Sequence, residues 1–238
     1  MRSDAVQRVL EDEVTAARDR RGGLPPRVLD VGGGTGVWAV PLAASGCLVT
    51  VIEPNPNALA ALHRRAEEAG VAELITAVQG DADALGVAGG SADLVLAHEL
   101  LEEVDDVPAA MAALTNAIAP HGALSVLVAN KYAAVLHRAL AGNLTDAHRL
   151  LDNPDGQLPG AGEPVLRRFD VTSLAELVTK SGLTVEVLQG HGVLAGLLPS
   201  TVREAGPSDA LADLELAAAT QPPLRDIAAR LHTLARRD

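Results

Sequence analysis

Short apolar runs rich in β-branched residues alternate with longer stretches of helical periodicity through the first half of the chain. The runs cover residues 27–31, 48–52, 74–78, 94–97 and 123–129. Between them, apolar residues recur three or four positions apart, which is the spacing of an amphipathic helix. Strands that alternate with helices build a parallel sheet with helices on its faces. The pattern therefore predicts an α/β fold.

Two of the predicted helices have identifiable ends. Asn55 and Pro56 supply an N-cap and a proline at the first helical position, and Gly70 marks the end of that helix. The apolar spacing over 107–118 predicts the next helix. Residues 120–122, a Pro-His-Gly sequence, predict a turn into the fifth strand.

The second half of the chain has a less regular pattern. It predicts helices over 131–151 and 170–180, the first broken at 142–143, then a strand over 183–188 and a mostly helical tail from 208. Segment 152–164 is rich in Pro and Gly and is longer than a compact connection needs. Such a segment is either a lid over a substrate or a plain surface connection.

Length and composition suit one domain. With 238 residues, 48% of them hydrophobic, we predict a single domain over 1–238, divided into a cofactor-binding half at 26–130 and a substrate-side half at 131–238. Cys47 is the only cysteine and no histidine pair has the spacing of a metal site, so we predict no disulfide and no metal. Since no signal-type or bilayer-length apolar run occurs, we expect a cytoplasmic protein without a membrane partner.

The charge balance bears on possible partners. The net charge is −12, and Trp38, Tyr132 and Phe169 are the only aromatic residues. Binding to a phosphate backbone normally needs a basic surface, and binding to single strands needs aromatic side chains for base stacking. We therefore expect a small-molecule or nucleoside substrate rather than bulk nucleic acid. The pattern does not predict an oligomeric state.

A glycine-rich loop follows the first predicted strand in the sequence RVLDVGGGTGVWAV. Asp30 stands at the end of the strand, and Gly32, Gly33, Gly34 and Gly36 follow it. Ligands of open α/β sheets bind at the carboxyl ends of the strands, and glycines let a ligand approach the main chain because they have no Cβ. A helix starting near Gly36 would point its amide end at the same place.

Two classes of cofactor use such a loop. The dinucleotide fingerprint fits only in a frame from Gly34 to Ala39, because the frame from Gly32 places Val37 at its last position. That late frame leaves Asp30 beside a pyrophosphate, which it would repel. A cofactor with a cationic end, such as the methionyl part of S-adenosylmethionine, explains both the carboxylate and the glycines.

Two further acidic positions follow the next strands. Glu53, with Pro54 beside it, ends the second strand, where a carboxylate accepts both hydroxyls of a ribose in either cofactor class. Asp81 and Ala82 follow the third strand, where they suit the amino group and ring of an adenine. Asp83 is an alternative to Asp81.

With these positions in order, residues 27–128 resemble the class I S-adenosylmethionine-dependent methyltransferases. The resemblance implies a Rossmann-like, mostly parallel seven-stranded sheet with an antiparallel last strand and helices on both faces. It places Asp30 and the glycines at the methionyl end of the cofactor. It also implies a final strand at 230–236, inserted between the fifth and sixth, although the local apolar spacing over 224–235 is helical. We side with the resemblance there and expect helix only over 224–229.

A narrower resemblance concerns the substrate. AHELLEEV, followed by NKYAAVLHRALAGN, is similar to the branch that methylates the carboxyl of 5-carboxymethoxyuridine in tRNA. In that branch a His-x-x-Leu-Glu segment precedes an Asn-containing strand end. Leu194 follows Gly192 and Val193, where the branch carries an arginine suited to a carboxylate. Two kinds of acceptor therefore remain possible: a wobble uridine of tRNA, or a small acid or hydroxyl compound.

Several polar residues are candidates for catalysis or substrate binding. Methyl transfer is an in-line displacement that depends mostly on positioning, and only a hydroxyl or amine acceptor needs a base. His98, at the end of the fourth strand beside the expected sulfonium, is the first candidate for cofactor contact and catalysis. The other candidates are Asn130 for catalysis, and Lys131, Tyr132, Arg167, Arg168 and His191 for the substrate. The acids at 99, 102, 103, 105 and 106 fit a solvated helix start, with Asp105 or Asp106 as its cap.

The leading hypothesis is thus an enzyme that transfers a methyl group from S-adenosylmethionine to an oxygen of a small molecule or nucleoside. A non-catalytic S-adenosylmethionine-binding subunit or sensor is a second hypothesis, because the cofactor positions alone do not distinguish the two. A nicotinamide oxidoreductase is a third.

Overall fold

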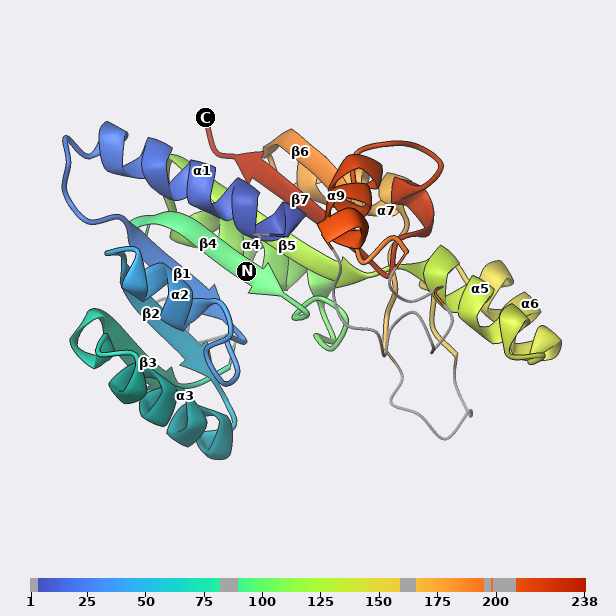
Figure 1. Cartoon of the computed structure of the whole chain (residues 1–238), viewed down its shortest axis with the longest axis horizontal. Helices are drawn as coiled ribbons and strands as arrows, with labels where there is room; N and C mark the ends of the chain where they lie inside the picture. The colour runs from blue at the N-terminus through green and yellow to red at the C-terminus, as the bar shows by residue number, and fades with distance from the viewer. Residues whose placement is uncertain (1–3, 82–89, 159–165, 195–197, 199–208) are drawn as a thin grey trace.

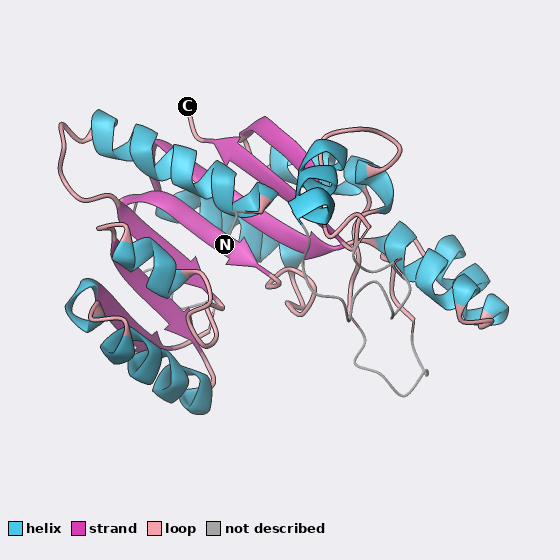
Figure 2. Ribbon diagram, viewed as in Figure 1, coloured by secondary structure: helices cyan, strands magenta, loops and turns pink. Residues whose placement is uncertain are grey.

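Figures 1 and 2 show the computed structural model of the chain, which describes residues 4–81, 90–158, 166–194, 198 and 209–238. A seven-stranded sheet lies between helices on its two faces. The strands are β1 (Arg27–Val31), β2 (Leu48–Glu53), β3 (Ile75–Gln79), β4 (Ala92–His98), β5 (Ile118–Ala129), β6 (Thr184–His191) and β7 (Arg230–Arg236).

The order of the strands is β3-β2-β1-β4-β5-β7-β6. Neighbours from β3 to β5 are parallel, whereas β7 is antiparallel to both β5 and β6. This arrangement confirms the predicted Rossmann-like fold class and the insertion of the last strand. It also brings the carboxyl ends of β1, β2 and β4 to one edge of the sheet.

The C-terminal segment forms a strand despite its helical spacing. Residues 231–235 are all buried, because β7 is flanked by β5 and β6 and both of its faces are covered. Burial on both faces selects a continuous run of buried residues, and this tertiary context overrides a local periodicity. The expected helix over 224–229 is reduced to the single turn η3 (Arg225–Ile227).

Helices cover both faces of the sheet. The apolar sides of α1 (Ala5–Arg20), α2 (Ala39–Ala44) and α3 (Pro56–Glu68) belong to the core on one face. Those of α4 (Val107–Ala117) and α7 (Val171–Lys180) belong to the core on the other. In Figure 1, α1 crosses the strands on the near side and α4 lies behind them.

The remaining helices lie around this core. They are η1 (Ala72–Leu74), α5 (Lys131–Leu140), α6 (Leu144–Asp152) and α9 (Asp209–Ala218). In Figure 1, α5 and α6 lie together at one end of the molecule, away from the strands. In the part of the chain described, no helix is both long and apolar enough to cross a bilayer.

Three local predictions need correction. The helix after the glycine loop begins at Ala39, since residues 34–38 form turns. Residues 120–122 belong to β5 instead of preceding it, with His121 at a φ of 61°. The helix predicted over 107–118 ends at Ala117, capped by Asp106. The N-cap and proline predicted at Asn55 and Pro56 are present.

Candidate active site

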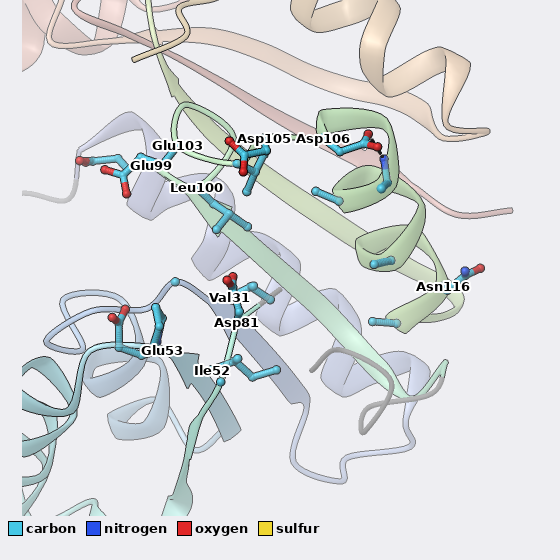
Figure 3. Close-up of a pocket in the computed structure, with 18 residues that line it drawn as sticks. Val31, Ile52, Glu53, Asp81, Glu99, Leu100, Glu103, Asp105, Asp106 and Asn116 are labelled. Carbon is cyan, nitrogen blue, oxygen red and sulfur yellow. Dashed lines mark hydrogen bonds between the residues drawn. The ribbon is translucent and has the colours of Figure 1, made fainter. Parts of the chain in front are cut away.

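A cavity of about 830 Å³ opens at the carboxyl ends of β1, β2 and β4 (Figure 3). Four residues that we predicted for the cofactor line it, namely Gly32, Glu53, Pro54 and Asp81. Ala82 and Asp83 lie outside the described residues. The cavity therefore brings the predicted methionyl, ribose and adenine positions to one place.

The lining of this cavity is strongly acidic. It includes Glu53, Asp81, Glu99, Glu103, Asp105 and Asp106. Among the described residues that line it, none is Lys, Arg or His. In Figure 3, the carboxylates of Glu99, Glu103, Asp105 and Asp106 lie on the opposite side of the cavity from Glu53. A cavity of this sign favours a cationic ligand and disfavours a pyrophosphate.

Glu53 ties the glycine loop to the end of β2. Its Oε2 accepts a hydrogen bond from the Gly34 amide at 3.0 Å, and its Oε1 accepts one from the Asn55 amide at 2.9 Å. Each carboxylate oxygen keeps a second lone pair, and the residue faces the cavity. The geometry thus leaves Glu53 able to accept a pair of ribose hydroxyls while it holds the loop.

Asp30 is buried at the end of β1, with 1% of its surface exposed. Its Oδ2 finds no hydrogen-bond partner within the described chain. Burial, and secondarily the charge of Glu53, raises the pKa of Asp30 to about 7. A buried carboxylate without a partner is costly, so a cationic group at this place would stabilise its ionised form.

The glycines of the loop have separate roles. Gly32 lines the cavity, and Gly34 donates to Glu53. A Cβ on Gly33 would lie 2.6 Å from Oδ2 of Asp30, so only glycine covers that carboxyl closely. Gly36 packs against the side chain of Leu62 on α3, where a Cβ would collide. Its role is therefore to let the loop pack on a helix.

His98 belongs to a chain of buried polar groups that crosses four strands. Its Nε2 lies 2.8 Å from Oγ of Ser125, and that hydroxyl lies 2.9 Å from Nε2 of His232. Nδ1 of His232 lies 3.0 Å from Nε2 of Gln189, which donates to the Ala5 carbonyl at 3.0 Å. The chain joins β4 to the first residue of α1 through β5, β7 and β6.

The carbonyl at the end of this chain determines the direction of every hydrogen bond. A carbonyl only accepts, so the Gln189 nitrogen faces it, and that NH₂ group also donates to Nδ1 of His232. His232 therefore carries its proton on Nε2 and donates to Ser125. The buried Ser125 hydroxyl has one proton of its own to donate, and the acceptor that this chain offers it is Nε2 of His98, which places the His98 proton on Nδ1.

The resulting state of His98 differs from the base that we predicted. Burial, followed by the charges of His232 and His191, holds the pKa of His98 well below its usual range, so the ring is neutral. Its Nδ1 is buried and has no hydrogen-bond partner among the described residues. The Trp38 ring packs edge-on against it at 4.9 Å between centroids. The network favours a hydrogen-bond donor over a base.

Asn130 uses its whole side-chain amide within the protein. Its Oδ1 caps α5 by accepting from the Tyr132 amide at 2.9 Å, and its Nδ2 donates to the carbonyls of Asp226 and Ala228 at 2.9 and 2.7 Å. Only 1% of the residue is exposed. These contacts favour a structural role, in which Asn130 fixes the segment before β7, over the catalytic role that we predicted.

The predicted substrate residues do not line the large cavity. Lys131 is buried and donates from Nζ to the Asn153 carbonyl at 3.2 Å, whereas Tyr132 is 39% exposed. Arg168 donates to the carbonyls of Gly156 and Leu166. His191 ends β6 in the register of Arg230 on β7. Their substrate roles stay predictions.

Arg167 braces the segment that follows β4. Its backbone amide donates to the Glu102 carbonyl at 3.0 Å, and its Nη1 donates to the Val104 carbonyl at 3.1 Å. This contact holds residues 102–104 beside the edge of the sheet. These two contacts of Arg167 are therefore structural, and a role in binding an anionic substrate stays a prediction.

Sequence reasoning missed one functional candidate, Glu102. The acids after β4 were expected to be solvated, yet only 6% of Glu102 is exposed. Its Oε1 accepts from the Ala129 amide at 2.7 Å, while Oε2 is buried without a hydrogen bond to any described group. Burial raises the pKa of Glu102 to about 7. The signal available in the sequence was the apolar pair Leu100 and Leu101 directly before it, and Leu101 is indeed buried.

The chain resembles known proteins in sequence and in fold. Ubiquinone biosynthesis O-methyltransferase of Azorhizobium caulinodans is 33% identical over 116 residues, which are 49% of this chain and 45% of that protein. tRNA 5-carboxymethoxyuridine methyltransferase of Escherichia coli K12 is 30% identical over 118 residues, with 49% and 45% covered. The matched part thus spans about half the length of these curated relatives.

Among solved structures, an S-adenosylmethionine dependent methyltransferase from Mesorhizobium loti superposes with a TM-score of 0.62. That likeness covers 97% of each chain at 18% identity, and it shows the fold alone. A family model described as "Methyltransferase domain" matches residues 2–188, which is most of the chain. The chain therefore belongs to the methyltransferase domain family, whose cofactor is S-adenosylmethionine.

Proposed function

We propose that this chain transfers a methyl group from S-adenosylmethionine to an oxygen of a small molecule or nucleoside. The observation that carries the proposal is Asp30, a buried carboxyl with an oxygen left without a partner in the described structure, beside an acidic cavity. Both curated relatives are named as methyltransferases, and the ubiquinone enzyme as an O-methyltransferase. We also propose that residues 1–238 act as one domain.

The residues at the sheet edge fit the cofactor. Asp30 would meet its ammonium group, Glu53 its ribose hydroxyls, and Asp81 its adenine. Gly33 packs directly on the Asp30 carboxyl, where a Cβ would lie 2.6 Å from Oδ2, so only glycine lets the loop lie this close to the carboxyl. When bound, S-adenosylmethionine supplies an electrophilic methyl group on a sulfonium. The acidic lining favours that positive charge over the phosphates of a dinucleotide.

The chain's own residues would act mainly by positioning. Glu53 holds the loop through Gly34, and the hydrogen bonds of Ser125 fix the His98 ring at the end of β4. The burial of His98 and Asp30 keeps water from both groups. An in-line displacement gains most of its rate from such fixed geometry.

Two other functions are alternatives to this proposal. A tRNA wobble uridine is the acceptor named for one relative, but an acidic cavity and three aromatic residues suit a polyanion poorly. A non-catalytic S-adenosylmethionine-binding protein would keep the same cofactor positions. Consumption of labelled cofactor with cell extract, separated into RNA, protein and small-molecule fractions, distinguishes these three functions.

The test of cofactor binding uses S-adenosylhomocysteine and titration calorimetry. We expect binding by the wild type, and we expect Glu53→Ala to weaken it by about 1.5–3 kcal/mol, the scale of hydrogen bonds to a charged group. We expect Asp30→Asn to weaken binding as well and to abolish the proton release that accompanies it. Proton release is measured in buffers of different ionisation enthalpy. Binding of a dinucleotide in place of S-adenosylhomocysteine would refute the proposal.

A further inference from the structure

A second, smaller cavity of about 290 Å³ adjoins the large one. Glu99 and Glu103 line both cavities, so the two are neighbours at the end of β4. The smaller cavity is otherwise lined by Glu102, Arg230 and three apolar residues, Ala129, Leu166 and Ala229. It has the size and the mixed lining of a site for a ring-sized organic group.

Glu102 lines this cavity, and its carboxyl has a buried oxygen without an assigned role. The side chain is held by the Ala129 amide at Oε1, and its backbone carbonyl is held by the Arg167 amide. Oε2 remains buried and unpaired in the described structure. A structural carboxyl in a buried position normally has partners for both oxygens, so the free Oε2 indicates a ligand.

We propose that the smaller cavity is the methyl-acceptor subsite, that the acceptor group is a hydroxyl and not a carboxylate, and that Glu102 takes the hydroxyl proton. This inference rests on the proposed function, because it assumes that the cofactor occupies the adjacent acidic cavity. It goes further by choosing between the two classes of oxygen acceptor.

The charges around the cavity carry the choice of a hydroxyl. Among the described residues that line it, three are acidic and one, Arg230, is cationic, and Arg230 is paired with Glu99 at 2.9 Å. A carboxylate acceptor would meet an excess of negative charge, which costs free energy in a partly buried site. A hydroxyl instead donates a hydrogen bond, which is what Oε2 of Glu102 lacks.

The transfer step balances with Glu102 as the base. The acceptor oxygen forms a bond to the methyl carbon while the bond from that carbon to sulfur breaks, and sulfur keeps the electron pair. The O–H proton passes to Oε2 of Glu102, which becomes a neutral carboxylic acid and later loses the proton to solvent. The products are a methyl ether, a neutral thioether and one proton.

The ionisation of Glu102 gives the step a pH dependence. Burial raises its pKa to about 7, and the groups that face it are Glu99, Arg230 and the Ala129 amide. Glu103 shares the cavity, and Arg167 braces the same segment. Since the carboxylate is the base, we expect acceptor binding and transfer to rise with pH through about 7.

The deciding experiment measures binding without turnover. The protein loaded with S-adenosylhomocysteine is titrated with para-fluorophenol or para-fluorobenzoate and followed by fluorine NMR from pH 6 to pH 8. We expect the phenol to bind increasingly well as pH rises and the benzoate to bind at least tenfold more weakly, a difference of about 1.4 kcal/mol. Equal affinity for the two probes would overturn the choice of acceptor.

Variants separate the base from a structural carboxyl. Glu102→Gln keeps an oxygen for the Ala129 amide, so we expect it to fold, to bind S-adenosylhomocysteine within twofold of wild type, and to lose the pH dependence of phenol binding. Glu102→Asp should restore that dependence in part. Glu176→Gln, an exposed site on α7 paired with Lys180, makes the same charge change elsewhere and should behave as wild type.

Activity provides the last readout. With hydroxyl compounds from the small-molecule fraction, Glu102→Gln should lower the transfer rate by about 10²–10⁴-fold, the usual contribution of a general base. Wild-type rates and pH dependence in Glu102→Gln would refute the role of Glu102. If the wild type itself failed to bind S-adenosylhomocysteine, the proposed function would fall instead, so the two failures are distinguishable.

Discussion

Asp30 and Glu102 are buried carboxyls at the same edge of the sheet, and each has an oxygen without a hydrogen-bond partner in the described chain. They differ in their neighbours. Asp30 is covered by the glycine loop and faces the charge of Glu53, which also raises its pKa. Glu102 accepts a backbone hydrogen bond from Ala129, which partly offsets the effect of burial.

On the two roles that we propose, one kind of side chain serves two purposes. Oδ2 of Asp30 has no hydrogen-bond donor among the described residues, so a cation from outside the chain would stabilise its ionised form. Glu102 is held at one oxygen, while the other is buried without a partner in a residue that lines a small cavity, so on our proposal it suits the uptake and loss of a proton. Each purpose predicts a separate response to pH and to substitution.

The largest expected effect is on stability. Below about pH 4 both carboxyls are protonated in the folded and unfolded states. Between about pH 4 and 7 the folded chain keeps protons that the unfolded chain has lost, so the free energy of unfolding falls as pH rises. The loss is about 2–4 kcal/mol for each carboxyl and levels off above pH 7.

Denaturant titrations from pH 4 to 8 measure this effect. Asp30→Asn and Glu102→Gln should each remove part of the decline, so each variant gains stability relative to wild type as pH rises. S-adenosylhomocysteine should flatten the decline in wild type and in Glu102→Gln, but not in Asp30→Asn. If S-adenosylhomocysteine still flattened the pH dependence of the unfolding free energy in Asp30→Asn, Asp30 would not be the carboxyl that meets the cofactor.

A smaller effect is expected from Gly33→Ala. The added Cβ would lie 2.6 Å from Oδ2 of Asp30 and 2.8 Å from the Val51 side chain, and such overpacking costs about 1–3 kcal/mol of stability. We expect S-adenosylhomocysteine to bind about 10–100-fold more weakly by calorimetry, since Asp30 must move. Binding of para-fluorophenol at the other carboxyl should change little.

Gly142→Ala is the control for this variant. Gly142 has a φ of 82°, but a Cβ there meets no atom within 4 Å. It should lose some stability through backbone strain and keep its affinity for the cofactor. A Gly33→Ala variant that binds as tightly as Gly142→Ala would remove the glycine from the cofactor site.

Ser125→Ala tests the chain of buried polar groups that runs from His98 to Ala5. It leaves the buried Nε2 atoms of His98 and His232 without their shared partner, at a cost of about 1–3 kcal/mol. In the wild type, nitrogen-15 NMR should find the His98 proton on Nδ1 and the His232 proton on Nε2. A His98 proton on Nε2 would contradict the derived directions of the hydrogen bonds.

The smallest expected effect is on nucleic acid. In a gel-shift assay at physiological salt we expect no appreciable binding of bulk tRNA, given the net charge of −12. A salt-sensitive shift at low micromolar protein would favour tRNA as the acceptor. It would then contradict the assignment of Glu102 to a small hydroxyl acceptor.

The sequence predicted the cofactor side better than the acceptor side. The positions of Asp30, Glu53 and the glycines could be predicted, because a strand end and a glycine turn are encoded locally, whereas the helix after the loop begins three residues later than predicted. Residues 230–236 needed the family resemblance, since their local spacing is helical and only the neighbours β5 and β6 make them a strand.

The acceptor side depends on contacts between distant segments. The Asn130 amide is occupied by carbonyls at 226 and 228, and Arg167 by those at 102 and 104. No local pattern shows such partners, so polar residues at strand ends were interpreted as substrate contacts. Glu102 was missed for the same reason, because its burial arises where its segment packs against β5 and Arg167.

The place of β7 has a consequence for biosynthesis. β7 leaves the ribosome after β5 and β6 and yet must enter between them. At about 5–20 residues per second, synthesis from the end of β6 to the end of β7 takes roughly 2–9 s, during which both inner edges lack a partner. Unpaired edges with buried apolar rows are sites of aggregation. The nascent chain is therefore most prone to aggregation in the interval before β7 is inserted between β5 and β6.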